Sequence, residues 1–236
     1  MRSQQFASLL PLVLFLLGAV AVSGCDSNGS RRSQPLFGVN DRGYSTINPE
    51  VLRDRLSALP TESLSDEEAA SLKFLREEEK LARDVYRTLD DKWDLQAMDN
   101  IASSEDTHTE AVRLLLDRYD LADPAADQPD GSFQNDDLQT LHDSLLTVGQ
   151  TSENEALKVG AEVEEIDILD LREALDTFVD NEDITLVYEN LAKGSRNHLR
   201  AFVRNLERRG VTYEPKYLDP STYQSIIESG IERGPN

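Results

Sequence analysis

The chain is short of cysteine, of basic residues and of long apolar runs. Its 236 residues include one cysteine, Cys25, which excludes an internal disulfide and any metal site built on several cysteines. Lysine and arginine number 24 against 45 aspartate and glutamate residues, so the formal net charge is -21. Such a surface does not neutralise phosphates, and we therefore exclude nucleic acid as a partner. The acidity leaves open a cation-rich partner or a surface that its charge keeps soluble.

The longest apolar run lies near the N-terminus. Leu9 to Val22 follows the positive charge of Arg2, is shorter than a comfortable membrane span and leads into "VSGC". This pattern resembles a bacterial lipoprotein signal. We therefore expect residues 1–24 to be a signal peptide and Cys25 to carry a lipid that anchors the exported protein to the membrane, on the periplasmic or extracellular side. An ordinary signal peptide with an incidental cysteine is the alternative.

Composition divides the remainder of the chain into a tether, a helical domain and a tail. Residues 25–48 are rich in Ser, Gly, Asn and Arg and lack apolar periodicity, which predicts a flexible tether. The domain is expected over residues 49–219, and residues 220–236 form a C-terminal tail that adds one more turn of helix at most. No stretch alternates apolar and polar residues with period two, so we expect no sheet.

Helical periodicity fills the domain. Apolar residues recur at steps of three and four in each of the segments expected to be helical, and Ser65, followed by three acids, predicts a helix start at residue 66. Gly210 predicts a helix end. The expected helices cover a short segment within 48–59 and then 66–93, 97–119, 136–147, 152–179 and 184–209. The predicted fold class is all-α.

Two of these helices carry charged residues inside their apolar stripes. Glu79 lies in the stripe of the first long helix, and Glu105 and His108 lie in that of the second. A buried carboxylate is costly unless it is paired, protonated or bound to a metal. Glu105 and His108 are three residues apart, on one helical face, as metal ligands are in helical bundles. The alternative is a surface Glu-x-x-His pair, which is common in helices.

An internal repeat strengthens the metal interpretation. Six residues between Asn100 and Arg118, His108 among them, recur 90 positions later, where His198 matches His108. The first and third long helices align at an offset of 86, which pairs Glu78 and Glu79 with Glu164 and Glu165. Two duplicated helix hairpins, joined by a crossover over residues 121–151, predict a four-helix bundle. The expected ligands around its central cavity are Glu79, Glu105, His108, Glu165 and His198.

These motifs resemble the ferritin-like superfamily of carboxylate-bridged di-metal bundles. More narrowly, "REEEKLARDVY", "GAEVEEIDILDL" and "GSRNHLRAF" are similar to a bacterial and archaeal family of ferritin-like domains of unknown function, over residues 72–217. The resemblance implies a ferritin-like fold and no known reaction. Tyr86, seven residues after Glu79, is similar to a tyrosine near the first-helix glutamate of ferritins. We expect Tyr86, Asp84, Asp170 and Ser195 to support the ligands.

One departure from the ferritin-like pattern concerns the fourth helix. That pattern has Glu-x-x-His there, whereas this chain has Ser195 before His198. Serine is a poor ligand for divalent iron or manganese, so Ser195 leaves open a vacant coordination position, a bound water, a single metal ion or none. The choice within each glutamate pair is also open, with Glu78 and Glu164 as alternatives. The apolar stripe of the third helix favours Glu164, whereas the repeat favours Glu165.

Three classes of function follow. The first is a di-metal oxidoreductase in which one or two iron or manganese ions react with oxygen or peroxide, or oxidise ferrous iron. The second is a module that binds or senses metal without turnover. The third is a structural lipoprotein that retains a metal-free Glu/His network and presents an acidic face to a partner. A protein partner or a homo-oligomer is compatible with each class.

Overall fold

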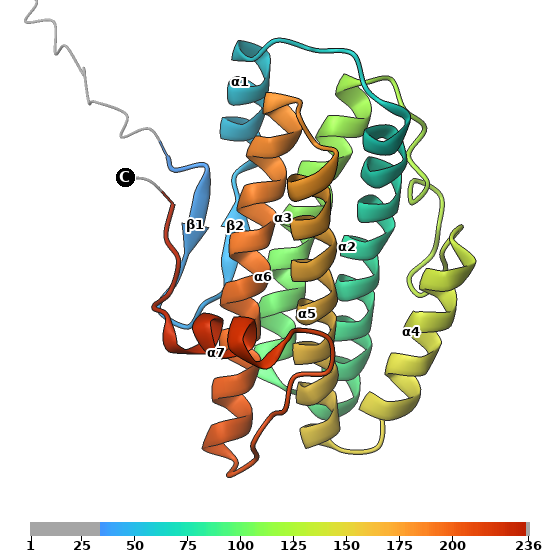
Figure 1. Cartoon of the computed structure of the whole chain (residues 1–236). Helices are drawn as coiled ribbons and strands as arrows, with labels where there is room; N and C mark the ends of the chain where they lie inside the picture. The colour runs from blue at the N-terminus through green and yellow to red at the C-terminus, as the bar shows by residue number, and fades with distance from the viewer. Residues whose placement is uncertain (1–33, 235–236) are drawn as a thin grey trace, which may run out of the picture. The chain divides into compact units, whose positions relative to one another are not determined.

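The computed structural model describes residues 34–234, and this part of the chain is mainly helical (Figure 1). Its order is two strands followed by seven helices: β1 (Phe37–Val39), β2 (Ser45–Ile47), α1 (Pro49–Ala58), α2 (Asp66–Trp93), α3 (Gln96–Arg118), α4 (Asp136–Gly149), α5 (Glu153–Thr177), α6 (Glu182–Arg208) and α7 (Pro220–Glu228). The all-α prediction is confirmed at this level. The signal peptide over 1–24 and the lipidated Cys25 lie outside the described residues.

The helix boundaries follow local capping signals. At the start of α2 the Ser65 side chain accepts a hydrogen bond from the Glu68 N–H, and the Glu68 carboxylate accepts one from the Ser65 N–H. The same helix ends at Asp94, whose left-handed backbone (φ 52°) turns the chain directly into α3. All the predicted long helices are present, and their ends differ from the prediction by two residues or fewer.

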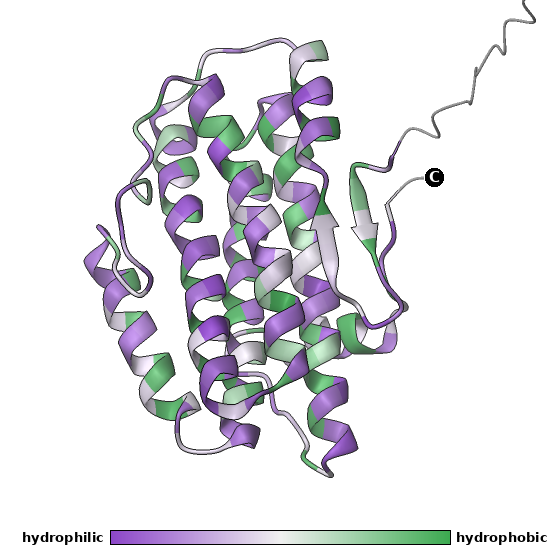
Figure 2. Ribbon diagram, turned by 180° about the vertical axis from the view of Figure 1, so that it is seen from behind, coloured by the Kyte–Doolittle hydropathy of each residue, from purple (hydrophilic) through white to green (hydrophobic). Residues whose placement is uncertain are grey.

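The four long helices pack as two hairpins. Helix α2 lies along α3, and α5 lies along α6, while α3 with α6 and α2 with α5 join the two hairpins (Figure 1). Polar and apolar residues are interspersed along each long helix in Figure 2, as expected where one face of a helix is buried. The segment between α3 and α5 holds α4, which packs against α2 and α5.

The hydrophobic core has two parts. One cluster includes Leu89 and Met98, and the other includes Leu72 and Leu115, towards the opposite ends of the same two helices. On α2 the stretch 76–80 between these clusters is polar and buried, and α3 and α6 have buried polar residues at the corresponding level. A polar layer therefore crosses the interior between two apolar regions.

The prediction of no sheet was wrong. Strands β1 and β2 pair antiparallel with Phe37 opposite Ile47, and the turn between them uses Gly43 at φ 93°, a conformation that favours glycine. Strand β2 packs on α3 and α6. The flexible tether expected over 25–48 is accordingly corrected for residues 34–48: Phe37 and Ile47 anchor this hairpin in the core, a contact that is invisible in so short a segment.

The C-terminal segment also packs on the domain. Helix α7 lies across α6, as Figure 1 shows, so the tail predicted over 220–236 contains a nine-residue helix where at most one turn was expected. Glu232 then forms ion pairs with Arg196 and Arg200 on α6. Among the described residues, no helix is both long enough and apolar enough to cross a membrane.

Candidate metal centre

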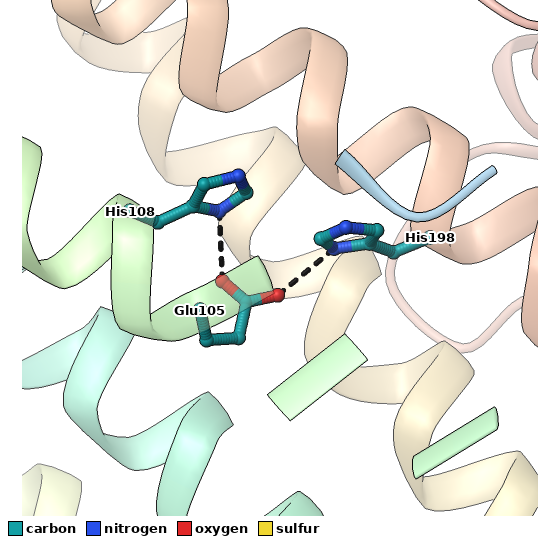
Figure 3. A group of neighbouring side chains, drawn as sticks. All are labelled: Glu105, His108 and His198. Atoms are coloured by element: carbon teal, nitrogen blue, oxygen red, sulfur yellow. Dashed lines mark ion pairs between the residues drawn. The ribbon is translucent and has the colours of Figure 1, made fainter. Parts of the chain in front are cut away.

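Glu105 joins two histidines from different hairpins at the polar layer. Its Oε2 lies 2.8 Å from Nδ1 of His108, one turn further along α3, and its Oε1 lies 2.8 Å from Nδ1 of His198 on α6. Figure 3 shows the carboxylate between the two imidazoles. All three side chains are buried, and one ligand atom from each lies within 4.8 Å of the others. This cluster can hold a metal ion.

Two further carboxylates flank the cluster, one beside each histidine. Glu79 on α2 approaches Nδ1 of His108 at 3.5 Å, and Glu164 on α5 approaches Nδ1 of His198 at the same distance. Each imidazole therefore faces Glu105 and one glutamate from the first helix of its own hairpin. We call these five residues, Glu79, Glu105, His108, Glu164 and His198, the Glu/His centre. Its two halves are arranged alike around Glu105.

Several polar atoms of the Glu/His centre lack a hydrogen-bond partner. They include both carboxylate oxygens of Glu79, one oxygen each of Glu105 and Glu164, and Nδ1 of both histidines. The 2.8 Å contacts of Glu105 are short, but they do not satisfy hydrogen-bond geometry at Nδ1. Buried polar atoms are rarely left without partners, because the loss of hydration is not repaid. The orphaned atoms converge from four helices, as ligands of a shared cation would.

The charges of the centre depend on one another. Burial alone would lower the pKa of both imidazoles, but the charge of Glu105 raises the pKa of His108 to about 10, and the charges of Glu164 and Glu105 raise that of His198 to about 9. Burial raises the pKa of Glu79 to about 7 against the opposing effect of His108. Burial also acts on Glu105, yet the two imidazoles outweigh it and hold the pKa of Glu105 well below its usual range. Protons thus compete with metal for both Nδ1 atoms.

The outer nitrogens of the two imidazoles share one hydroxyl. Ser45 on β2 places its Oγ 3.0 Å from Nε2 of His108 and 2.9 Å from Nε2 of His198. The rings stack at a centroid distance of 5.3 Å. One hydroxyl has a single proton to donate, so at least one Nε2–H donates to Ser45. The backbone N–H of Ser45 donates to Nε2 of His198 at 3.4 Å, so Nε2 of His108 is the donor to the hydroxyl, and the Nδ1 lone pair of a neutral His108 ring faces the centre.

Gly194 makes room for this arrangement. A Cβ at Gly194 would come within 2.5 Å of Cε1 of His108 and 2.9 Å of Oγ of Ser45. A side chain here would displace the ring or the hairpin. The glycine on α6 therefore permits the close approach of β2 and His108.

The structure separates the two glutamates of the third-helix pair. Glu164 belongs to the centre, whereas Glu165 turns towards the C-terminal segment and accepts hydrogen bonds from the Tyr213 hydroxyl and from the backbone N–H groups of Lys216, Tyr217 and Leu218. Consecutive residues on a helix point about 100° apart, so only one of the pair can face the centre. The structure thus replaces the expected ligand Glu165 by its alternative, Glu164. On α2 it places Glu79 at the centre and Glu78 beside it.

The residues expected to support the ligands have different surroundings. Tyr86 donates a 2.7 Å hydrogen bond to Glu164, so it contacts the centre. Asp84 instead forms ion pairs with Lys80 and Arg83 and accepts from the Gly131 N–H, which holds the loop before α4. Asp170 lies beside Glu78. Ser195 is buried and donates to the Leu191 carbonyl of its own helix.

Sequence reasoning missed two residues near the centre. Ser45 was placed in a tether, and no periodicity in its short strand signals the contact with both histidines. Asp167 is buried, and burial and the charges of Glu78, Glu164 and Glu79 raise the pKa of its carboxyl. Its position three residues after Glu164 puts it on the same face of α5, and this spacing was a readable signal.

Comparisons with known proteins place the centre in a family. The model of an uncharacterized protein domain, DUF2202, matches residues 68–230. The uncharacterized protein MJ0754 of Methanocaldococcus jannaschii is 50% identical over 181 residues, which are 77% of this chain and 97% of the relative. The crystal structure of hypothetical protein MJ0754 from Methanococcus jannaschii is similar with a TM-score of 0.72 at 50% identity and covers 74% of this chain and 99% of that chain. The family match includes the whole Glu/His centre, whereas Ser45 precedes it.

Proposed function

The chain belongs to the DUF2202 family, and we propose that it is a ferritin-like metalloprotein whose four long helices form a bundle around two iron or manganese ions. The observation that carries this proposal is the position of Glu105 between two Nδ1 atoms, with one further carboxylate beside each imidazole. Three carboxylates and two imidazoles are a ligand set that suits these metals. Helices that face one another supply it, as in carboxylate-bridged bundles.

The residues present fit such a group in number and in position. Glu79 and His108 would hold one ion, Glu164 and His198 the other, and Glu105 would contact both. Their orphaned oxygen and nitrogen atoms are the atoms that a cation would satisfy. Ser195, in place of a second shared glutamate, reduces the protein ligands and leaves room for an exogenous one.

Iron or manganese in this centre would supply one-electron redox chemistry with oxygen or peroxide, which makes oxidoreductase activity part of the proposal. The chain's own residues prepare the site. Ser45 orients both imidazoles through Nε2, and Tyr86 orients Glu164 through its hydroxyl. Apolar clusters on both sides limit the access of bulk water.

One observation favours a second candidate function. The raised pKa values of His108 and His198 allow two imidazolium ions to balance the carboxylates without a metal. A structural lipoprotein with a metal-free Glu/His network would use this balance. Its centre would hold protons where the first candidate holds ions, so metal content separates the two functions.

The deciding experiment is elemental analysis of the full chain, solubilised in detergent and purified without chelators. We expect about two iron or manganese ions per chain. Replacing both ligating histidines, H108A with H198A, should remove the ions bound at the Glu/His centre. The third histidine provides the matched control: His142 is buried and contacts Asp143, away from the centre, so H142A should retain the metal. Absence of metal after anaerobic reconstitution of the wild-type chain would refute the proposal.

We also propose that lipidated Cys25 anchors this centre to a membrane outside the cytoplasm. The apolar run that leads into the only cysteine of the chain supports this location. Cell fractionation checks it: the wild-type chain should sediment with membranes, and C25S should move to the soluble fraction. Equal distribution of the two proteins would contradict the anchor.

A further inference from the structure

A second group of buried carboxyls lies beside the Glu/His centre, on α2 and α5. Glu78 and Asp167 are each 2% exposed. Both carboxyl oxygens of Glu78 and one carboxyl oxygen of Asp167 are buried and have no hydrogen-bond partner. In the described part of the chain, neither residue forms a salt bridge with Lys, Arg or His. Two uncompensated acids in the interior require a cation or a proton.

An open cavity reaches this group from the surface. It has a volume of about 420 Å³ and lies between α2 and α5, two helices that pack together, with Tyr188 of α6 in its wall. Glu78 and Asp170 line its inner part, while Glu67 and Glu173, both exposed, line its outer part. Four acids, two residues with hydroxyl groups and six apolar residues line the cavity, and none of the lining residues is basic. A cation would thus meet negative charge from the entrance to the buried end.

The polar atoms of the cavity offer oxygen only. Besides the four carboxyls, they include the Ser71 and Tyr188 hydroxyls, which are hydrogen-bonded to each other at 2.9 Å. Oxygen ligands select hard divalent cations, which commonly keep part of their water shell. The volume is sufficient for an ion with several waters, since one water occupies about 30 Å³ in the liquid.

Asp167 connects the cavity with the Glu/His centre. Glu164, Asp167 and Asp170 follow one another at steps of three residues along one face of α5, so Asp167 lies one turn from the cavity residue Asp170. Burial and then the charges of Glu78, Glu164 and Glu79 raise the pKa of Asp167. Asp167 does not line the cavity and lies one helical turn from Glu164. An ordered set of carboxyls therefore runs from solvent to the ligands.

We propose that this cavity binds a hydrated divalent metal cation between Glu78 and Asp170 and passes it through Asp167 to the Glu/His centre. The binding site stands on the cavity and its orphaned carboxyl, Glu78, alone, whereas delivery rests on the proposed metal function of the centre. The competing occupant is a proton shared by Glu78 and Asp170. Burial and then the charge of Asp170 raise the pKa of Glu78, which would favour that proton in the absence of a cation.

The first experiment tests the site without the centre. The full chain carrying H108A and H198A is titrated with Tb³⁺, an oxygen-seeking probe whose luminescence is excited through nearby tyrosine, here Tyr188 in the cavity wall. We expect one tight, tyrosine-sensitised site. Adding E78Q and D170N should remove it, and adding D170N alone should weaken it at least tenfold. Asp176 provides the control: it is exposed on the same helix, so D176N should leave the tight site intact.

Retention of the sensitised signal in the variant with E78Q and D170N would overturn the proposal, as would a parent chain with no tight site. If the parent chain had no tight site, the cavity would hold the proton shared by Glu78 and Asp170 and no cation. Circular dichroism shows whether each variant is folded. If the double substitution unfolds the chain, D170N alone decides, because Asp170 is only partly buried.

The second experiment tests delivery in the chain with its histidines intact. Stopped-flow absorption follows Co²⁺ as it reaches the imidazoles. D170N should slow this uptake about tenfold and leave the final amount of bound Co²⁺ unchanged. An unchanged rate would overturn the delivery role. If the wild-type centre binds no Co²⁺, the proposed metal function fails, and the Tb³⁺ titration still decides the cavity site.

Discussion

Two kinds of buried carboxylate stand side by side on α2 and α5. Both oxygens of Glu77 and of Glu165 accept hydrogen bonds: Glu77 from the N–H groups before α4, and Glu165 from the segment that follows α6. Their sequence neighbours Glu78, Glu79 and Glu164 keep oxygens without any partner. Glu77 is followed directly by Glu78, and Glu165 directly follows Glu164, so the two kinds are adjacent in the sequence.

The difference shows that burial alone does not tell whether a carboxylate has a structural or a ligand-binding role. The partnered acids tie loops and chain ends to the helices, and their hydrogen bonds repay the cost of desolvation. Glu79 and Glu164 face the two histidines, and Glu78 lies beside them. Their orphaned oxygens have nothing comparable to repay that cost. A partnered acid therefore has a structural role, whereas the orphaned acids are those for which we propose a bound cation. Four predictions test this contrast.

The largest expected effect is that of metal removal. Chelation of the loaded chain should lower the thermal midpoint by on the order of 10 °C, since two ions present at 100 times their Kd contribute about 5 kcal/mol, and 1 kcal/mol corresponds to a few degrees in a domain of this size. Differential scanning calorimetry measures the midpoint. Chelator should lower the midpoint much less in the chain with H108A and H198A, because that chain lacks the imidazole ligands of the centre. If chelation left the thermal midpoint unchanged, the orphaned acids would not bind a stabilising cation, and the contrast with the partnered acids would fail.

Substitution by glutamine should reduce the stability of the metal-free chain much more at Glu165 than at Glu164. E165Q should destabilise the metal-free chain by about 2–4 kcal/mol, because an amide nitrogen would replace an oxygen that accepts backbone hydrogen bonds. E164Q should change that stability by about 1 kcal/mol or less, since its amide oxygen can still accept from Tyr86.

For metal affinity the order of the two variants should be reversed, with a larger loss in E164Q than in E165Q. E164Q removes a proposed ligand, whereas E165Q leaves the centre unchanged. Denaturant unfolding and metal titration on both proteins provide the four values. Equal losses of metal affinity in E164Q and E165Q would contradict the division between them.

The stability of the metal-free chain should fall as pH rises from about 5 to 10. Burial raises the pKa of Glu79 to about 7, so the folded state holds a proton that the unfolded state releases above its ordinary pKa. The raised pKa values of His108 and His198, about 10 and 9, act in the same direction: their contribution is complete below pH 6.5 and is lost as pH rises through these values.

Urea unfolding in the presence of a chelator should show a loss of roughly 2 kcal/mol over this pH range. Metal affinity should increase over the same range, because the imidazoles must lose protons to bind. The chain with H108A and H198A is the control and should have a flatter profile above pH 7. A wild-type profile that rises with pH would show that the centre does not hold these protons.

The smallest expected effect comes from the hairpin. S45A removes the hydroxyl that contacts both Nε2 atoms, and we expect metal affinity to fall about tenfold, the lower end of the effect of such supporting contacts. Thr46 is exposed on the other face of β2, so T46A is the matched control. Isothermal titration with Mn²⁺ measures both. Equal affinities in S45A and T46A would show that the imidazoles do not need this contact.

Most of the helical architecture could be predicted from local signals. The capping box at Ser65 and Glu68 and the apolar steps along α2 define that helix without reference to its neighbours. The same logic identified Glu79, Glu105 and His108, because charged residues inside an apolar stripe are visible in one helix at a time. His198 came from its match to His108 in the internal repeat.

The choice between Glu164 and Glu165 could not be made in this way. The repeat at an offset of 86 pairs Glu79 with Glu165, but the structure places Glu79 opposite Glu164, a difference of one residue and about 100° of rotation. Both positions are buried, so the apolar pattern accommodates either. The decision depends on the segment 213–218, whose donors occupy Glu165.

By itself, then, the amino-acid sequence determined the long helices, their pairing as hairpins and the inward-facing residues Glu79, Glu105, His108 and His198, because these properties can be read from periodicity and from the internal repeat. Only the tertiary structure decided that Ser45 joins the two histidines, that Glu164 faces them and that Glu78 meets an open cavity. The physical reason is that each of these contacts links segments distant in the chain, where side-chain direction and the supply of donors depend on the packing of the whole domain.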